Sequence, residues 1–170
     1  MKRTGLILAT LAVLTLGTVS YASLDKRPAT VPSTQVTAQV LTTPTTQELL
    51  DAVNAERAKV GVAPLVIDTR LNDSAKFKAD DMVATNDLDH VDVNGKHGYE
   101  YAMEYNPDCK IPSENISTST LDYRNTLAVV DGWMNSKPHH DAMLNPSYST
   151  TGFGIVWGDT MVVVQHFCTI

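Results

Sequence analysis

Residues 152–167 read GFGIVWGDTMVVVQHF, and this stretch decides the fold class. It contains two runs rich in β-branched and aromatic residues, at 152–157 and 161–167, on either side of Gly158-Asp159. Such runs favour β-strands, and a glycine beside an aspartate is typical of a tight hairpin turn. The sequence therefore predicts a β-hairpin close to the end of the chain.

A helix is predicted at about 46–60, upstream of the hairpin. Thr45 and Glu48 have the spacing of a capping box, and apolar residues recur after them at helical intervals. Gly61 is a favourable residue directly after a helix, and Pro64 prevents the helix from continuing.

Two further helices are predicted, from Asp68 to Ala84 and from about Leu121 to Asn135, because apolar residues share one face in each. The stretch 86–119 between them contains several glycines and prolines and is expected to be a loop. Helices come first and the hairpin comes last. This order indicates the α+β class, with helices packed on a central antiparallel sheet.

The first 22 residues have the features of a secretion signal. Lys2 and Arg3 precede an uncharged run of fifteen residues, which ends at Ser20-Tyr21-Ala22 with small residues at the positions that signal peptidase requires. Fifteen residues are fewer than the ~20 that a membrane-spanning helix needs, so an uncleaved anchor is the less favoured alternative. Removal of the signal leaves no expected membrane span.

The next part of the chain differs in composition from the rest. From Pro28 to Gln47 there is no charged residue, while threonine and proline are frequent, and such a stretch buries too little apolar surface to fold. The predicted organisation is a signal peptide at 1–22, a disordered Thr/Pro-rich stalk at 23–45 and one folded domain at 46–170.

Charge and cysteine content exclude several function classes. The 170 residues include 13 Lys plus Arg and 19 Asp plus Glu, for a net charge of −6. Because such a surface repels phosphate backbones, nucleic acid is not an expected partner. The two cysteines do not form a CxxC motif, which excludes iron–sulfur clusters and zinc ribbons. In an oxidising compartment Cys109 and Cys168 most simply form one disulfide; two buried thiols too far apart to bridge are the alternative.

Three residues are candidates for chemistry. His90 follows the second predicted helix, His139 follows the third, and Glu114 lies between them. Spacing alone leaves open that the histidines are surface or capping residues and that Glu114 is a charge at a helix N-terminus. There is no HExxH motif and therefore no helical zinc-protease signature.

Five short motifs, in matching order across about 46–168, change this assessment. The sequence resembles the CAP superfamily (cysteine-rich secretory proteins, antigen 5 and pathogenesis-related 1 proteins, or SCP-like domains) in its secreted bacterial form. The motifs are Leu50–Arg57 followed by Pro64-Leu65, His90 with Gly95, Ser113-Glu114-Asn115-Ile116, Trp133–Ser136 followed by His139, and Gly152-Phe153-Gly154.

The resemblance implies a three-layer α-β-α sandwich with a cleft lined by two histidines and two acidic residues. By motif the histidines are His90 and His139, and the first acid is Glu114. Ser136 stands where the second acid is expected, so the cleft has one carboxylate. His140 is an alternative to His139, but the Ser-x-x-His spacing favours His139.

The resemblance also implies a set of functions. Two neutral imidazoles, His90 and His139, together with Glu114 can bind zinc or another divalent cation with an open position for water. We therefore expect a secreted binding module whose cleft takes a divalent metal or a small ligand, with a lipid or a cell-wall component as partner. The alternative is a metal-dependent hydrolase or peptidase that acts on extracellular or cell-wall substrates through metal-bound water. No catalytic residue is assigned.

Four aromatic residues bear on the lipid hypothesis. They are expected to pack helix 121–135 on the terminal strands, although some family members bind lipids and a lipid groove is the alternative. The four residues are Trp133, Phe153, Trp157 and Phe167.

Overall fold

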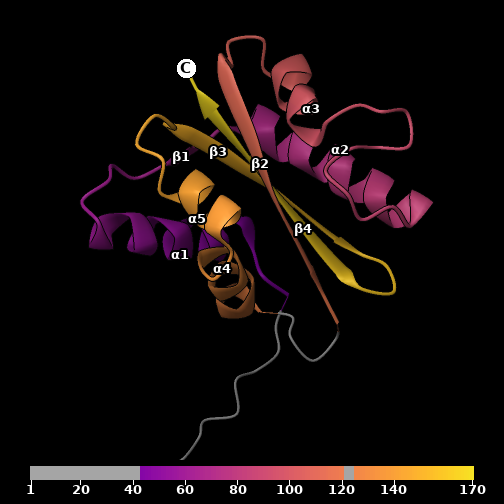
Figure 1. The fold of residues 1–170 in the computed structure, drawn as a ribbon, viewed down its shortest axis with the longest axis horizontal. Helices are drawn as coiled ribbons and strands as arrows, with labels where there is room; N and C mark the ends of the chain where they lie inside the picture. The colour runs from indigo at the N-terminus through magenta and orange to yellow at the C-terminus, as the bar shows by residue number, and fades with distance from the viewer. Residues whose placement is uncertain (1–42, 121–124) are drawn as a thin grey trace, which may run out of the picture. The chain divides into compact units, whose positions relative to one another are not determined.

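The computed structural model describes residues 43–120 and 125–170, so the predicted signal peptide and most of the predicted stalk lie outside the described residues. Figure 1 shows the elements in the order α1 (Thr46–Lys59), β1 (Val66–Ile67), α2 (Thr69–Thr85), α3 (Gly98–Tyr105), β2 (Ile111–Ser119), α4 (Thr126–Met134), α5 (Lys137–Met143), β3 (Thr150–Trp157) and β4 (Met161–Thr169). Within the described residues, no helix is both long enough and apolar enough to cross a membrane.

The four strands form one mixed sheet in the order β1-β3-β4-β2. Strands β3 and β4 are the predicted hairpin, with Gly158-Asp159 between them, and β2 pairs antiparallel with β4 along its whole length. The short β1 pairs with β3 in parallel, so the sheet is antiparallel except at that edge. Strand β2 forms the opposite edge.

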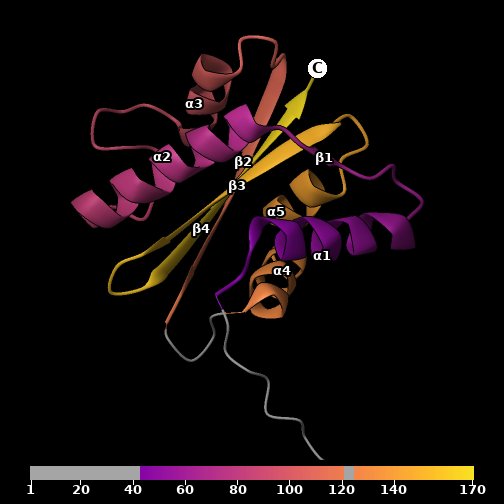
Figure 2. The ribbon, with the colours of Figure 1, turned by 180° about the vertical axis from the view of Figure 1, so that it is seen from behind.

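Helices cover both faces of the sheet, as the resemblance implied. Figures 1 and 2 show α2 and α3 on one face and α1, α4 and α5 on the other. Alternate side chains of β4 serve the two layers, because successive residues of a strand point to opposite faces. Val162 and Val164 pack against the apolar face of α2. Val163 and Phe167 pack in the core that contains Trp133. The domain is therefore a three-layer α-β-α sandwich of the α+β class.

The prediction of a loop at 86–119 is wrong, because this stretch contains both α3 and β2. Helix α3 begins where the Glu100 side chain accepts a hydrogen bond from the backbone N–H of His97, and Tyr101 packs against Phe77 of α2 with ring centroids 4.9 Å apart. Strand β2 is rich in Ser, Thr and Asn. Its conformation comes from pairing with β4 rather than from its own propensity.

The third predicted helix is observed as α4, and residues 121–124 of that prediction lie outside the described residues. The chain then begins a separate helix, α5, which the sequence did not predict. Pro138 occupies the first turn of α5, where a missing N–H breaks no helical hydrogen bond.

Both ends of α1 are fixed. Thr45 and Glu48 form the predicted capping box at its start. Near its end, Arg57 is fully buried. The guanidinium donates hydrogen bonds to the backbone carbonyls of Ala63, Met143, Asn145 and Tyr148. These bonds tie α1 to the segment that connects α5 with β3.

The predicted disulfide between Cys109 and Cys168 is present. It joins the segment before β2 to the end of β4, next to Leu71 of α2 and Ala102 of α3. The bridge closes a long loop and therefore restricts the unfolded chain. It also anchors the start of the edge strand that carries Glu114.

Candidate functional site

Glu114 lies at the centre of the site, on the edge strand β2. Its side chain is only 2% exposed. One carboxylate oxygen, Oε1, lies 2.7 Å from Nδ1 of His90, and the other, Oε2, lies 3.1 Å from Nε2 of His166. An ionised carboxylate only accepts hydrogen bonds, so both imidazole nitrogens donate to it. Glu114 and His166 are also opposite one another in the β2–β4 register.

The hydrogen bonds continue from His166 into α2. The Ser74 hydroxyl, which donates to the backbone carbonyl of Leu71, lies 2.8 Å from Nδ1 of His166. The side chains therefore form a continuous series Ser74–His166–Glu114–His90. Ser, His and an acid are the residue types of a hydrolytic triad, but a nucleophile must reach its substrate. Ser74 and His166 are fully buried, so here they position Glu114.

His90 is held in place by the loop that follows it. The backbone N–H of Gly98 donates to the carbonyl of His90 at 2.7 Å. Within the loop, Asp92 accepts hydrogen bonds from the Tyr101 hydroxyl and from the backbone N–H groups of Lys96 and Asn94. These bonds, led by the one from Tyr101, lower the pKa of Asp92 to about 2.

Gly98 is needed for the close approach of α3 to the site. A Cβ atom at this position would lie 1.8 Å from Oε2 of Glu114, far inside van der Waals contact. Because α3 begins at Gly98, the helix start packs directly on the carboxylate. A side chain here would displace Glu114 from His166.

His139 reaches the site from α5, on the other face of the sheet. Asn115, the neighbour of Glu114 in β2, donates a hydrogen bond from its side chain to the backbone carbonyl of His139 at 3.2 Å. The ring centroids of His139 and His90 are 6.2 Å apart. The two imidazoles can meet because β2 is an edge strand, with residues from both helical layers beside it.

The other predicted position, Ser136, lies at the N-cap of α5. Within the described ranges, its hydroxyl makes no hydrogen bond to Glu114, His90 or His139. The alternative histidine, His140, has its ring nitrogen Nδ1 3.3 Å from the Asp141 carboxylate. His140 therefore has a polar partner of its own.

The charges of the site follow from these contacts. Burial opposes ionisation of Glu114, but the hydrogen bonds from His166 and His90 outweigh it and hold the pKa of the carboxyl below its ordinary value. The hydrogen bond to Glu114 raises the pKa of His90. Burial, reinforced by the charge of His90, lowers the pKa of His139. At neutral pH Glu114 is therefore ionised and His139 is neutral.

One further buried side chain, that of Lys78, acts electrostatically on the site. Lys78 is fully buried on α2, one helical turn after Ser74, and its Nζ has no hydrogen-bond partner among the described residues. Its charge acts on both His90 and Asp92 and lowers their pKa values. The ammonium therefore partly offsets the effect of Glu114 on His90.

Sequence reasoning named His90, Glu114 and His139 as candidates but missed the buried residues that contact Glu114 or act on the site. A signal for these residues was present, since a polar side chain on an apolar strand or helix face needs a polar partner. His166 follows the run Met161–Gln165 in such a strand. Ser74 and Lys78 interrupt the apolar face of α2 in the same way.

The amino-acid sequence of this chain is similar to a known protein family and to known bacterial proteins. The family model described as cysteine-rich secretory protein family, CAP, matches residues 50–167. The uncharacterized protein YkwD of Bacillus subtilis is 32% identical over 134 residues, which are 78% of this chain and 51% of YkwD. The chain thus spans about half the length of this relative.

Solved structures share the fold. An extracellular protein containing a SCP domain from Bacillus anthracis superposes with a TM-score of 0.63 at 22% identity, over 74% of this chain and 40% of that one. A crystal structure of NaASP2 with Zn²⁺ superposes with a TM-score of 0.53 at 13% identity, over 71% of this chain and 77% of that one.

Proposed function

Because this chain belongs to the cysteine-rich secretory protein (CAP) family, we propose that it is an extracellular binding module whose His90 and His139 bind a divalent metal such as zinc. In this proposal Glu114 orients His90, while His166 and Ser74 hold Glu114. A bound zinc ion would accept a small ligand at its remaining positions.

The observation that carries the proposal is the 2.7 Å contact between Nδ1 of His90 and Glu114. Metal-binding histidines usually donate their second ring N–H to a carboxylate, which fixes the tautomer and the ring orientation. With Nδ1 protonated, a neutral His90 keeps its lone pair on Nε2. The His139 ring lies nearby, and its lowered pKa leaves it neutral and able to bind a metal.

The donor set fits a weak site rather than a closed structural one. Both oxygens of Glu114 already accept hydrogen bonds, and the described residues include no group of three or more His, Cys, Asp or Glu placed to hold a metal. Two imidazoles are one protein ligand fewer than open zinc sites usually have, so water or ligand would fill the remaining positions. The raised pKa of His90 and the charge of Lys78 both work against a bound cation. We therefore expect modest affinity.

Two further observations support the extracellular part of the proposal. Disulfides persist in oxidising compartments, and Cys109–Cys168 is such a bond. The Bacillus anthracis protein of the same fold is described as extracellular, and NaASP2 was crystallised with Zn²⁺. The signal peptide at 1–22 stays a prediction.

Calorimetric titration with zinc at about pH 7.5 tests the proposal on the wild type, His90→Ala, His139→Ala and the matched control His140→Ala. The wild type and the control should bind zinc, and the two cleft variants should not. At about pH 5 binding should disappear, because ligand imidazoles must lose their protons. Equal binding by all four proteins, or none by the wild type, would overturn the metal site.

A further inference from the structure

A pocket lies at the C-terminal end of α2, where the helix meets the β3–β4 hairpin. The cavity measures about 350 Å³ and is lined by Met82, Val83, Asn86, Leu88, Gly158, Asp159, Thr160 and Val162. None of these residues belongs to the Glu114 site. Small-molecule pockets have volumes upwards of about 300 Å³, so the space suffices for a small ligand.

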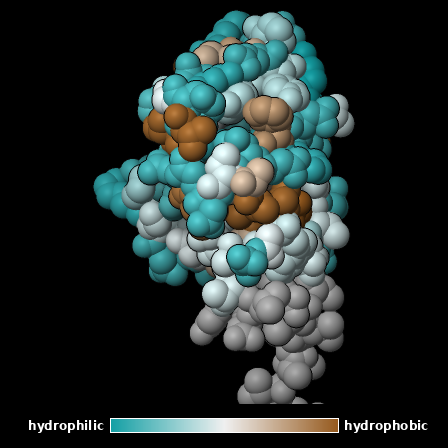
Figure 3. Space-filling view, turned by 90° about the vertical axis from the view of Figure 1, so that its right-hand side faces the viewer, coloured by the Kyte–Doolittle hydropathy of each residue, from teal (hydrophilic) through white to brown (hydrophobic). Residues whose placement is uncertain are grey.

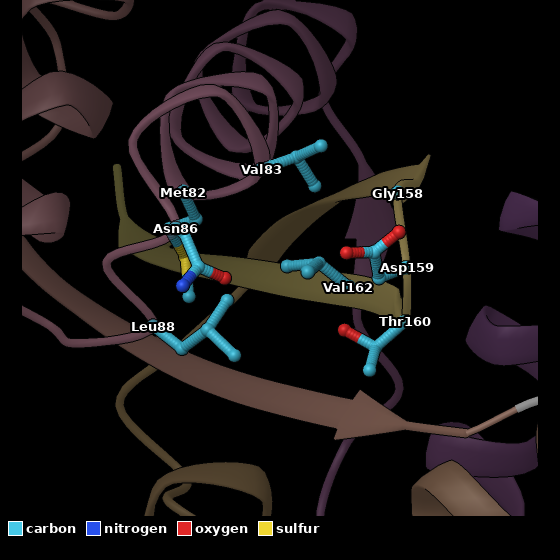
Figure 4. Close-up of a pocket in the computed structure, with 8 residues that line it drawn as sticks. All are labelled: Met82, Val83, Asn86, Leu88, Gly158, Asp159, Thr160 and Val162. Atoms are coloured by element: carbon cyan, nitrogen blue, oxygen red, sulfur yellow. The ribbon is translucent and has the colours of Figure 1, made fainter.

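The floor and one wall of this pocket are apolar. Met82 and Val162 are fully buried beneath it, and Val83 packs beside them. Leu88, 44% exposed, forms the wall that faces them, as Figure 4 shows. This end of the molecule faces the viewer in Figure 3, where hydrophobic side chains lie among hydrophilic ones. The pocket can therefore take the apolar part of a ligand.

The rim of the pocket carries oxygen atoms and negative charge. In Figure 4 the side chains of Asp159 and Thr160 extend from the hairpin, and the Asn86 carboxamide lies across from them at the end of α2. Asp159 has no ion-pair partner in the part of the chain that the structure describes.

The end of α2 increases this preference for a positive group. The last carbonyl groups of a helix lack helical partners and carry a partial negative charge. Basic residues often neutralise that charge, but the last turn of α2 contains none. Asn86 ends the helix in the left-handed conformation, with φ of 53°. The helix terminus and Asp159 therefore both make the electrostatic potential in the pocket more negative.

We propose that this pocket binds a small organic ammonium ion, a compound with one positively charged amine on a short apolar body. The amine pairs with Asp159 and donates hydrogen bonds to Thr160 and Asn86, while the apolar body lies on Val162 and Leu88. An inorganic cation would leave the apolar floor unused. A carboxylate or phosphate would face both Asp159 and the negative end of α2.

Amide chemical-shift mapping with hexylammonium chloride tests the proposal on the whole chain. Saturable shifts should be centred on Asn86–Leu88 and Gly158–Thr160, and they should weaken as salt is raised because the rim pair is partly screened. Hexanol and hexanoate have the same apolar body without the positive charge. Each should bind at least about fivefold more weakly than hexylammonium, because fivefold corresponds to the loss of one exposed ion pair.

Two substitutions and one control complete the experiment. Asp159→Asn keeps the size of the side chain and should weaken hexylammonium binding about two- to fivefold. Leu88→Ala should also weaken it while leaving the fold intact, since Leu88 is half exposed. Asp73→Asn makes the same charge change on an exposed position near the other end of α2 and should have no effect. Equal binding of hexanol, unchanged affinity in Asp159→Asn, or shifts centred elsewhere would overturn the proposal.

Discussion

Replacing Glu114 with glutamine tests whether one carboxylate holds both imidazoles. Glutamine has nearly the same size but offers one carbonyl oxygen and one NH₂ group. Only one imidazole N–H can donate to it, and the other then faces an amide donor. His90, with 48% of its side chain exposed, can turn to water, whereas His166 is fully buried and cannot.

The buried contact between His166 and Glu114 determines most of the expected loss of stability. A hydrogen bond to a charged group stabilises a protein by about 1.5–3 kcal/mol, and the His166–Glu114 bond belongs to this class. The His90–Glu114 bond is partly screened by solvent, so it contributes about 0.5–1 kcal/mol. We therefore expect Glu114→Gln to lower the free energy of unfolding by about 2–4 kcal/mol at its maximum.

The directions of two pKa shifts determine where this maximum lies. The pKa of Glu114 in the folded protein lies below its ordinary value of 4.5. The stability that its ionised form adds is therefore fully present above pH 4.5 and is lost as the pH falls through the folded pKa. The pKa of His90 in the folded protein lies above its ordinary value of 6.5. The stability that its protonated form adds is therefore fully present below pH 6.5 and is lost as the pH rises through the folded pKa. The difference between wild type and variant should be widest between these two values.

Urea denaturation at about pH 3, 5.5 and 8.5 measures that difference. Glu104→Gln is the matched control, because Glu104 is 59% exposed and forms an ion pair with Lys96. The control should stay within about 0.5 kcal/mol of wild type at each pH. A Glu114→Gln effect of that small size, or one that does not change with pH, would refute the assignment of Glu114 as the carboxylate that binds both rings.

Two further predictions concern other parts of the domain. Lys78→Met removes a buried positive charge that lowers the pKa of His90, so NMR titration should find that pKa raised further. The free energy of unfolding should rise by about 1–3 kcal/mol, because a buried group without a hydrogen-bond partner is lost. An unchanged or lower pKa of His90 would contradict the electrostatic effect, and a lower free energy of unfolding would show that Lys78 has a stabilising partner. Thiol titration of the denatured, unreduced protein should find no free thiol, and two reactive thiols per chain would disprove the bridge. The double variant Cys109→Ala with Cys168→Ala should have a lower Tm, and its free energy of unfolding should fall by up to about 4 kcal/mol.

The local patterns that predicted elements correctly share one property. The capping box at Thr45 and the turn at Gly158-Asp159 act over a few residues, so their physics is contained in the sequence. The stretch 86–119 lacked such signals. Its edge strand is polar, and it is a strand because β4 supplies its hydrogen bonds.

The candidate site divides in a similar way. His90, Glu114 and His139 were identified by motif, and the structure brings the first two into a hydrogen bond with the third ring beside them. Motif reasoning could not find His166 and Ser74. A buried histidine reveals its role only through its partners, and those partners lie 52 and 92 residues away in the chain.

The sequence by itself determined the α+β class and the terminal hairpin, and its motifs indicated three candidate site residues, because hydrophobic period, turn chemistry and short motifs are local properties. Tertiary structure alone decided that Glu114 lies on an edge strand, where His90 from one helical layer and His139 from the other can meet. Tertiary structure also decided that the end of α2 faces the β3–β4 turn across a pocket with an apolar floor and an acidic rim. Both arrangements depend on which strands are neighbours, and strand order is set by burial of the whole core rather than by any one segment.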